Sequence, residues 1–197
     1  MKDLVERIRF YLKIAGVTAI YRRYFVMNAF DGALTALGVV LGAWASGAIQ
    51  PRIIVGAGVG VSLAMGMSGF SGAYLAERAE RLRRLRELER SLLRSLERSV
   101  HGRALRTAII WAAAVDALSP ALSSLTSISP FIAAEHGVVS VSEAAAASVI
   151  IIFAILFILG VFTGRVSREH AFISGLRMLI VGVLTAALIL LWTGYRG

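Results

Sequence analysis

The chain has 197 residues, of which 57% are hydrophobic, and it carries a formal net charge of +9. Its mean hydropathy of +0.75 is too high for a soluble domain of this size. The absence of cysteine excludes disulfide frameworks, thiolate metal sites and cysteine nucleophiles. Because the basic residues lie in short blocks between long apolar runs, we expect the lipid bilayer, and not nucleic acid, to be the anionic partner.

Five apolar stretches are long enough to cross about 30 Å of hydrocarbon, which takes about 20 helical residues. They cover residues 25–49, 53–75, 107–132, 144–164 and 172–193. No segment alternates with period two over the length of a membrane strand. The sequence therefore predicts an all-α, polytopic integral membrane protein with five transmembrane helices. It forms a single membrane domain over residues 1–197, with two spans in 25–75 and three in 107–193.

The basic residues predict the orientation. They concentrate in segments 1–23, 76–106 and 165–168, whereas the opposite side has Arg52 and Arg196. By the positive-inside rule the N-terminus lies in the cytoplasm and the C-terminus outside. We therefore expect a multi-pass protein of the cell membrane in a prokaryote, or of a vacuole-type membrane in a eukaryote.

Two segments lie outside the spans. Residues 1–23 place Leu4, Ile8, Leu12 and Ala15 on one face with Lys and Arg between them, which predicts an amphipathic helix on the membrane surface.

Residues 76–104 predict one charged cytoplasmic helix. Its acids precede arginines at the i, i+4 spacing of favourable ion pairs, as in Glu77–Arg81 and Glu80–Arg84. A leucine stripe follows one face, and we expect it to pack against a second subunit or the N-terminal helix. The stripe consists of Leu82, Leu85, Leu88, Leu92 and Leu96.

Asp31 is the most informative residue, because an ionisable group inside a span is costly and usually functional. Asn28, Asp31, Thr35, Gly38 and Gly42 recur at steps of three or four and share one helix face. That face suits a hydrophilic path. It also suits close contact with another helix, in which case Asp31 has a structural role only.

Two further features accompany Asp31 in the second and third spans. Met65 and Met67 face different sides of the second span, and a thioether beside a carboxylate favours a borderline transition metal over Mg²⁺ or Ca²⁺. Asp116 lies one turn before Pro120, which removes a backbone donor, so that a carboxylate, a carbonyl and the following serines could line a wet cavity. The alternative for Asp116 is a kinked helix end near the interface.

A ridge of small residues follows the second span at steps of four, which predicts close helix packing. It consists of Gly56, Gly60, Ala64, Ser68 and Gly72. Two GxSG tetrads within 66–72 resemble intramembrane serine proteases, but no span supplies the histidine base that such a serine needs. We therefore expect a protein that is not an enzyme, without catalytic residues.

These residues resemble the vacuolar iron transporter family of yeast and plant vacuolar iron and manganese carriers. The resemblance rests on RYFVMNAFDGALTALGVVLGAW in the first span, on GAYLAERAER after the second, and on GLRMLIVGVLTAAL in the fifth. It implies a homodimer that exchanges Fe²⁺, and in some members other divalent metals, for protons. It also implies that Asp31, and Met65 or Met67, lie in the translocation path.

The chain departs from the family at two places. Ala73 stands where a glutamate usually precedes the tyrosine. The chain is also a short member, in which one arginine-rich segment replaces the large cytoplasmic metal-binding domain, and Glu77 and Glu80 are the remaining candidates for metal entry.

The resulting hypothesis is a proton-coupled exporter of Fe²⁺ or Mn²⁺ from the cytosol, with metal as cargo and no permanently bound cofactor. Its path residues are Asn28, Asp31, Thr35, Met65, Met67 and Asp116. The alternative is a non-transporting membrane scaffold that recruits a partner through the cytoplasmic helix.

Overall fold

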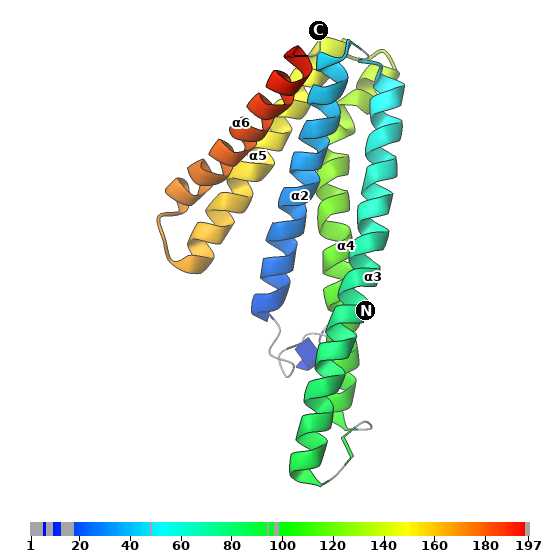
Figure 1. Cartoon of the computed structure of the whole chain (residues 1–197), viewed down its shortest axis with the longest axis vertical. Helices are drawn as coiled ribbons and strands as arrows, with labels where there is room; N and C mark the ends of the chain where they lie inside the picture. The colour runs from blue at the N-terminus through cyan, green and yellow to red at the C-terminus, as the bar shows by residue number, and fades with distance from the viewer. Residues whose placement is uncertain are drawn as a thin grey trace. The chain divides into compact units, whose positions relative to one another are not determined.

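The computed structural model describes residue 6 and residues 10–12, 18–47, 49–93, 95–96 and 99–195 (Figure 1). This part of the chain contains five helices, each long and apolar enough to cross a membrane. They are α2 (Thr18–Ala45), α3 (Pro51–Leu92), α4 (Val100–Glu135), α5 (Val141–Ser167) and α6 (Ala171–Gly194). The five predicted spans are thus confirmed, including the third, which continues as a helix past Pro120 and Pro130. Proline is tolerated within membrane helices because neighbouring groups can compensate for its missing donor.

The helices contribute to two compact units. The first unit comprises Met1–Phe25 and Gly66–Leu118, and the second comprises Val26–Met65 and Ser119–Gly197. In the first unit the core includes Tyr21, Ala108 and Ala112, with Leu12 packed against them. The Tyr21 hydroxyl donates a hydrogen bond to the Ala108 carbonyl oxygen at 3.0 Å, which joins α2 to α4 within this unit.

The second unit contains the larger apolar core. Leu37 of α2, Ile128 of α4 and Ile152 of α5 are fully buried in one cluster. A second cluster joins Val40 and Phe131 to the N-terminal turns of α5. The buried face of α2 is therefore the one opposite the polar face predicted from the sequence.

Glycines bring α5 and α6 into close contact as an antiparallel hairpin (Figure 1). A Cβ on Gly160 would lie 2.6 Å from Gly175 Cα, and one on Gly164 would lie 2.8 Å from Ala171 Cα. Because these neighbours are backbone atoms, only glycine fits at these contacts. Small residues that allow such approach are typical of membrane helix interfaces.

Local capping motifs explain where α4 ends and α5 begins. Gly137 has φ +73°, and its N–H and that of Val138 donate to the carbonyls of Ala134 and Ala133, which is a Schellman motif. Ser140 and Glu143 then form a capping box at the start of α5. These motifs were not singled out in the sequence.

The structure corrects the helix expected over residues 76–104. Residues 77–92 continue α3 without a break, and α3 ends where Leu93 adopts a left-handed φ of +51°. Residues from Val100 onward belong to α4. A helix already nucleated in the membrane extends easily into a segment rich in i, i+4 ion pairs, since adding residues is cheaper than starting a helix.

The structure also identifies a partner for the leucine stripe. Leu82 and Leu85 face Leu105 and Ile109 of α4 across a pocket, whereas Leu88 is exposed. The predicted packing of this stripe against a second subunit or the N-terminal helix is therefore corrected for its first two leucines. Of the predicted amphipathic helix over 1–23, most residues, including Leu4, Ile8 and Ala15, lie outside the described part of the chain.

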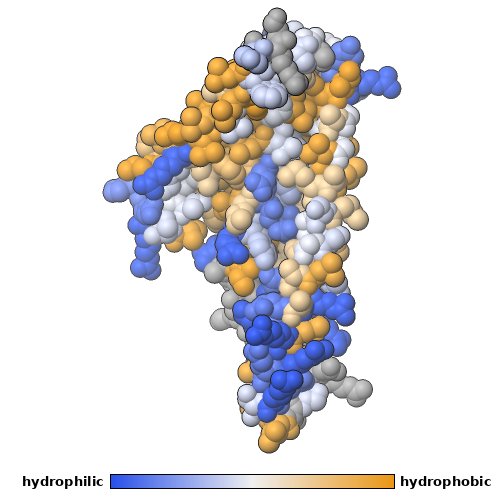
Figure 2. Space-filling model, viewed as in Figure 1, coloured by the Kyte–Doolittle hydropathy of each residue, from blue (hydrophilic) through white to orange (hydrophobic). Residues whose placement is uncertain are grey.

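Hydropathy differs sharply along the helices. Hydrophilic side chains gather over the C-terminal third of α3 and, separately, around the α5–α6 connection (Figure 2). The surfaces of α5 and α6 away from that connection are hydrophobic, with Leu188 and Leu191 each at least two-thirds exposed. Such exposure is unfavourable in water and normal in lipid, so the chain is a multi-pass integral membrane protein.

Candidate functional site

The polar face of α2 is open. Asp31 is exposed, Asn28 and Thr35 are half-buried, and a Cβ added at Gly38 or Gly42 would meet nothing within 4 Å. No described side chain forms an ion pair with the Asp31 carboxylate. A carboxylate in an apolar helix, on a face that the described residues leave open, is available to a cation, to water or to another copy of the chain.

Gly32, the residue after Asp31, fixes the rotation of α2. A Cβ at Gly32 would overlap the Pro120 carbonyl oxygen and lie 2.8 Å from Pro120 Cα, so α2 and α4 touch at the backbone here. Successive helix residues point about 100° apart, so Gly32 faces α4 while Asp31 faces outward. The Asp31-Gly32 pair of the sequence thus has a physical meaning: the glycine allows the contact that orients the aspartate.

Replacing Gly32 by alanine should destabilise the protein by about 1–3 kcal/mol, because the new methyl group meets backbone that cannot rotate away. Chemical unfolding in detergent micelles, followed by circular dichroism, measures the change. Gly66→Ala on α3 is the control, since its Cβ would meet only the Ala117 carbonyl oxygen, at an ordinary contact distance of 3.5 Å. It should be neutral or stabilise by up to about 1 kcal/mol through helix propensity. Equal effects of the two substitutions would contradict the tight contact.

The two methionines differ in their surroundings. Met65 is half-buried and belongs to the second unit, as Asp31 does, whereas Met67 belongs to the first unit and is 68% exposed. Two residues apart on a helix, they point about 200° apart, so only one of them can face a given site.

Asp116 lies in the first unit and is half-buried. A Cβ on Gly69 would be 2.9 Å from the Asp116 carbonyl oxygen and 3.0 Å from its Oδ2. Asp116 therefore lies against α3, at a point where only a glycine leaves room for its backbone and carboxylate. Pro120 follows four residues later and has no N–H to donate to this carbonyl.

Three serines after Pro120 are buried in the second unit: Ser123, Ser124 and Ser127. Ser127 donates to the Ser123 carbonyl at 2.8 Å, but the hydroxyls of Ser123 and Ser124 have no partner among the described residues. A hydroxyl buried without a partner is unfavourable unless ordered water reaches it. These two hydroxyls are therefore consistent with the internal water expected from the sequence.

The candidate entry glutamates are both paired with arginine. Glu77 receives a 2.6 Å ion pair from Arg81 and a 3.0 Å hydrogen bond from the Tyr24 hydroxyl, and both charged side chains are about nine-tenths buried. Glu80 pairs with Arg84 at 3.0 Å on the surface. The two predicted i, i+4 pairs are thus confirmed. To bind Glu77, a cation would have to displace both Arg81 and the Tyr24 hydroxyl from a buried site. To bind Glu80, it would have to displace only Arg84, whose exposed ion pair is weak.

The described residues contain no group of three or more His, Asp or Glu side chains that could hold a metal ion. A metal site at Asp31 must therefore use other donors. Amide and hydroxyl oxygens from Asn28 and Thr35, a thioether from Met65, or a second Asp31 from another copy could supply them.

The predicted packing of the small-residue ridge of α3 is not found within the described part of the chain. Gly56, Gly60 and Gly72 are exposed, and a Cβ on any of them would meet nothing within 4 Å. The glycine that does contact α4 in the second unit is Gly58, whose Cβ would collide with Ile128. Within the second unit, Gly56 and Gly60 are therefore open small residues, as Gly38 and Gly42 of α2 are.

Sequence reasoning missed two polar contacts. Tyr24, quoted only within the first-span motif, binds Glu77, and Arg177, inside the fifth span, pairs with Glu169 at 3.1 Å across the α5–α6 connection. The sequence contained a signal for the Arg177–Glu169 pair, because an arginine within an apolar span requires an anionic partner nearby.

Comparison with known proteins agrees with this arrangement. A sequence model of the VIT family matches residues 92–193. An uncharacterized protein of Methanocaldococcus jannaschii is 37% identical over 171 residues, which cover 85% of each chain. The family match covers α4 to α6, so it is independent of the first-span motif. Membership of this family indicates membrane metal transport in general and favours a transporter over an enzyme. The chain belongs to the VIT family.

Proposed function

We propose that the protein is a proton-coupled transporter that exports Fe²⁺, and Mn²⁺ as a second cargo, from the cytosol. The observation that carries this proposal is Asp31, an exposed carboxylate in the apolar helix α2, on a face that no other described segment covers. Keeping an ionisable group there is costly, and in membrane helices such groups mark ion pathways.

The coupling follows from the chemistry of one carboxylate. Ionised Asp31 attracts a divalent cation into the membrane, and protonated Asp31 has no charge with which to hold it. A proton arriving from the acidic side therefore displaces the metal, and loss of that proton restores the site. A thioether from Met65 would make the site softer than one built from oxygen alone, which favours Fe²⁺ over Ca²⁺.

The proposal includes a homodimer. The polar face of α2 and the ridge of Gly56, Gly60 and Gly72 are both open and lined by small residues. Small residues allow membrane helices of two copies to approach closely. A two-fold axis near Asp31 would bring two carboxylates together, so that the second copy would supply a second anionic ligand.

The experiment is metal flux into proteoliposomes that contain the purified protein. Fe²⁺, kept reduced with ascorbate, and Mn²⁺ are supplied with and without a pH gradient. We expect uptake that rises when the side receiving metal is acidic and falls when a proton ionophore removes the gradient. No movement of any divalent metal under any gradient would contradict transport and leave the scaffold alternative, to be tested by looking for a protein bound to residues 77–92.

Met65 and Met67 give a matched pair of variants. Met65→Leu should lower transport or raise the KM for Fe²⁺ by about 10-fold, whereas Met67→Leu should leave both unchanged, because the two side chains point about 200° apart on α3 and the proposal assigns Met65 to the site. Leucine keeps the volume and apolar character of methionine, so the folds should be equally stable. A loss with Met67→Leu alone would reverse the assignment.

A further inference from the structure

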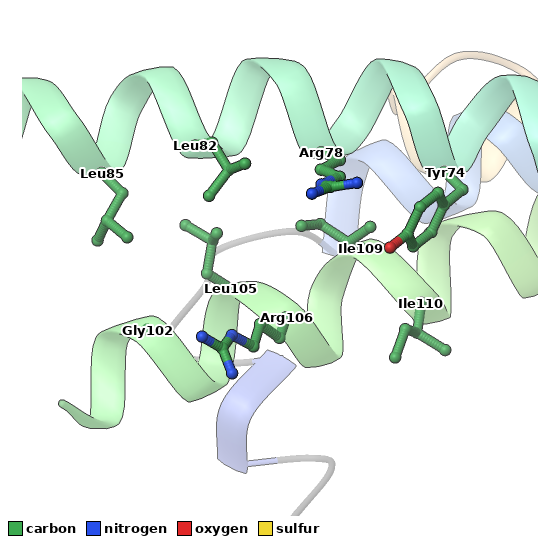
Figure 3. A pocket seen from close by; sticks show the side chains of 9 residues that line it. All are labelled: Tyr74, Arg78, Leu82, Leu85, Gly102, Leu105, Arg106, Ile109 and Ile110. Atoms are coloured by element: carbon green, nitrogen blue, oxygen red, sulfur yellow. The ribbon is translucent and has the colours of Figure 1, made fainter. Parts of the chain in front are cut away.

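A pocket in the first unit combines two arginines with an aliphatic wall. It has a volume of about 340 Å³ and lies between α3 and α4 (Figure 3). Tyr74 and Arg78 of α3 and Arg106 of α4 line its polar part, and Leu82, Leu85 and Leu105 line its apolar part. Figure 3 shows the leucines of the two helices facing each other and the Arg78 side chain between the helices.

The two arginines have no acidic partner within the described ranges of the chain. Arg81, Arg83 and Arg84 on the same stretch of α3 are each paired with a glutamate. Arg78 and Arg106, in contrast, form no ion pair with any carboxylate of the described residues. Both are exposed and line one pocket, so their positive charge is available to an external anion.

The position along the helices indicates which anion. On α3 the chain is apolar up to Leu75 and charged from Glu77, and on α4 it is charged up to Arg106 and apolar from Ala108. Both changes occur beside the pocket, so it lies at the level where lipid headgroups meet acyl chains. Tyr74 here, and Trp111, 42% exposed on α4, are residue types enriched at that level.

We propose that this pocket binds one anionic phospholipid. The guanidinium groups of Arg78 and Arg106 bind the headgroup phosphate, for which arginine has a fitting fork of donors. The acyl chain leaves the pocket toward the membrane along Ile109 and Ile110, which line it on the apolar side of Arg106. A free phosphate ion would use the arginines and leave this aliphatic wall in contact with water, which disfavours it as the natural occupant. Basic pockets between membrane helices, on the side where positive charge concentrates, suit such headgroups.

Binding is measured on the whole purified protein by native mass spectrometry and by thermal unfolding in detergent. The ligands are dioleoyl-phosphatidylglycerol, dioleoyl-phosphatidylcholine with the same tails, and inorganic phosphate. We expect phosphatidylglycerol alone to bind one per chain and to raise the unfolding temperature. Equal binding of phosphatidylcholine would overturn the charge selectivity, and an equal effect of inorganic phosphate would show an anion site and not a lipid site.

Variants locate the site. Arg78→Gln with Arg106→Gln should weaken phosphatidylglycerol binding about thirtyfold, from the loss of two arginine–headgroup interactions. Arg86→Gln with Arg103→Gln is the matched control: it also removes one exposed arginine from each helix, and neither residue lines the pocket. Arg78→Lys with Arg106→Lys keeps the charge and should retain most of the binding. Equal weakening in the pocket and control pairs would overturn the proposal in favour of general surface charge. These readouts require no transport, so they are independent of the proposed function.

Discussion

Replacing Asp31 by asparagine should lower the rate of Fe²⁺ transport by more than about 100-fold. Removing a residue that only holds a metal ligand in place typically lowers metal affinity or activity by about 10- to 100-fold, and losing the ligand itself should have a larger effect. The substitution keeps the size and hydrogen-bonding shape of the side chain but removes its charge and its ability to take up a proton. Because Asp31 is exposed and forms no ion pair with a described residue, its loss should not unfold the protein. Proteoliposome flux and the unfolding temperature are measured on the same preparation.

Two controls separate the role of Asp31 from charge in general. Glu135→Gln removes an exposed carboxylate at the end of α4 and should leave flux unchanged. Asp31→Glu keeps the carboxylate on a longer side chain and should retain partial transport. Full transport by Asp31→Asn, with folding intact, would show that Asp31 is structural and remove the main support for the proposed mechanism.

Replacing Arg81 by methionine should destabilise the protein by about 3–5 kcal/mol, because it leaves the Glu77 charge buried without its counter-ion. The Glu77–Arg81 pair is 2.6 Å long with both side chains about nine-tenths buried, and Tyr24 is the remaining partner of Glu77. Unfolding by a denaturing detergent, followed by circular dichroism, measures the loss. Arg84→Met is the matched control, because Arg84 forms the same type of i, i+4 pair with Glu80 but on the exposed surface. This substitution should lower the free energy of unfolding by at most about 1 kcal/mol.

The double variant Glu77→Gln with Arg81→Met tests the cause. If the uncompensated charge is responsible, neutralising Glu77 should recover much of the stability lost by Arg81→Met, since a buried pair can often be replaced by neutral groups. A double variant that is less stable than Arg81→Met would show that packing of the arginine stem, and not charge balance, is the larger effect.

The sequence alone determined the membrane architecture. Apolar stretches of membrane length predicted all five spans, because a segment that crosses the bilayer alone must be apolar and must satisfy its backbone hydrogen bonds internally, as a helix does. It also determined the Glu77–Arg81 and Glu80–Arg84 pairs, since both depend only on helical spacing. Asp31 was noticeable for the same local reason, as a charge in an apolar helix.

Tertiary structure decided everything that depends on which face meets which neighbour. The sequence could not distinguish Gly58, which contacts Ile128, from Gly56 and Gly60, which face open space, because all three are glycines in one apolar helix. Nor could it place Arg78 and Arg106, nearly thirty residues apart, on one pocket. The end of α3 at Leu92 likewise depends on the left-handed backbone conformation of Leu93. Glycine is the residue that usually adopts this conformation at a helix end, so a leucine there gave no sequence signal. The spacing of residues along a helix follows from backbone geometry and can be read from a local stretch of sequence. Which neighbour each helix face contacts depends on packing between segments distant in the chain, and no local stretch of sequence specifies that packing.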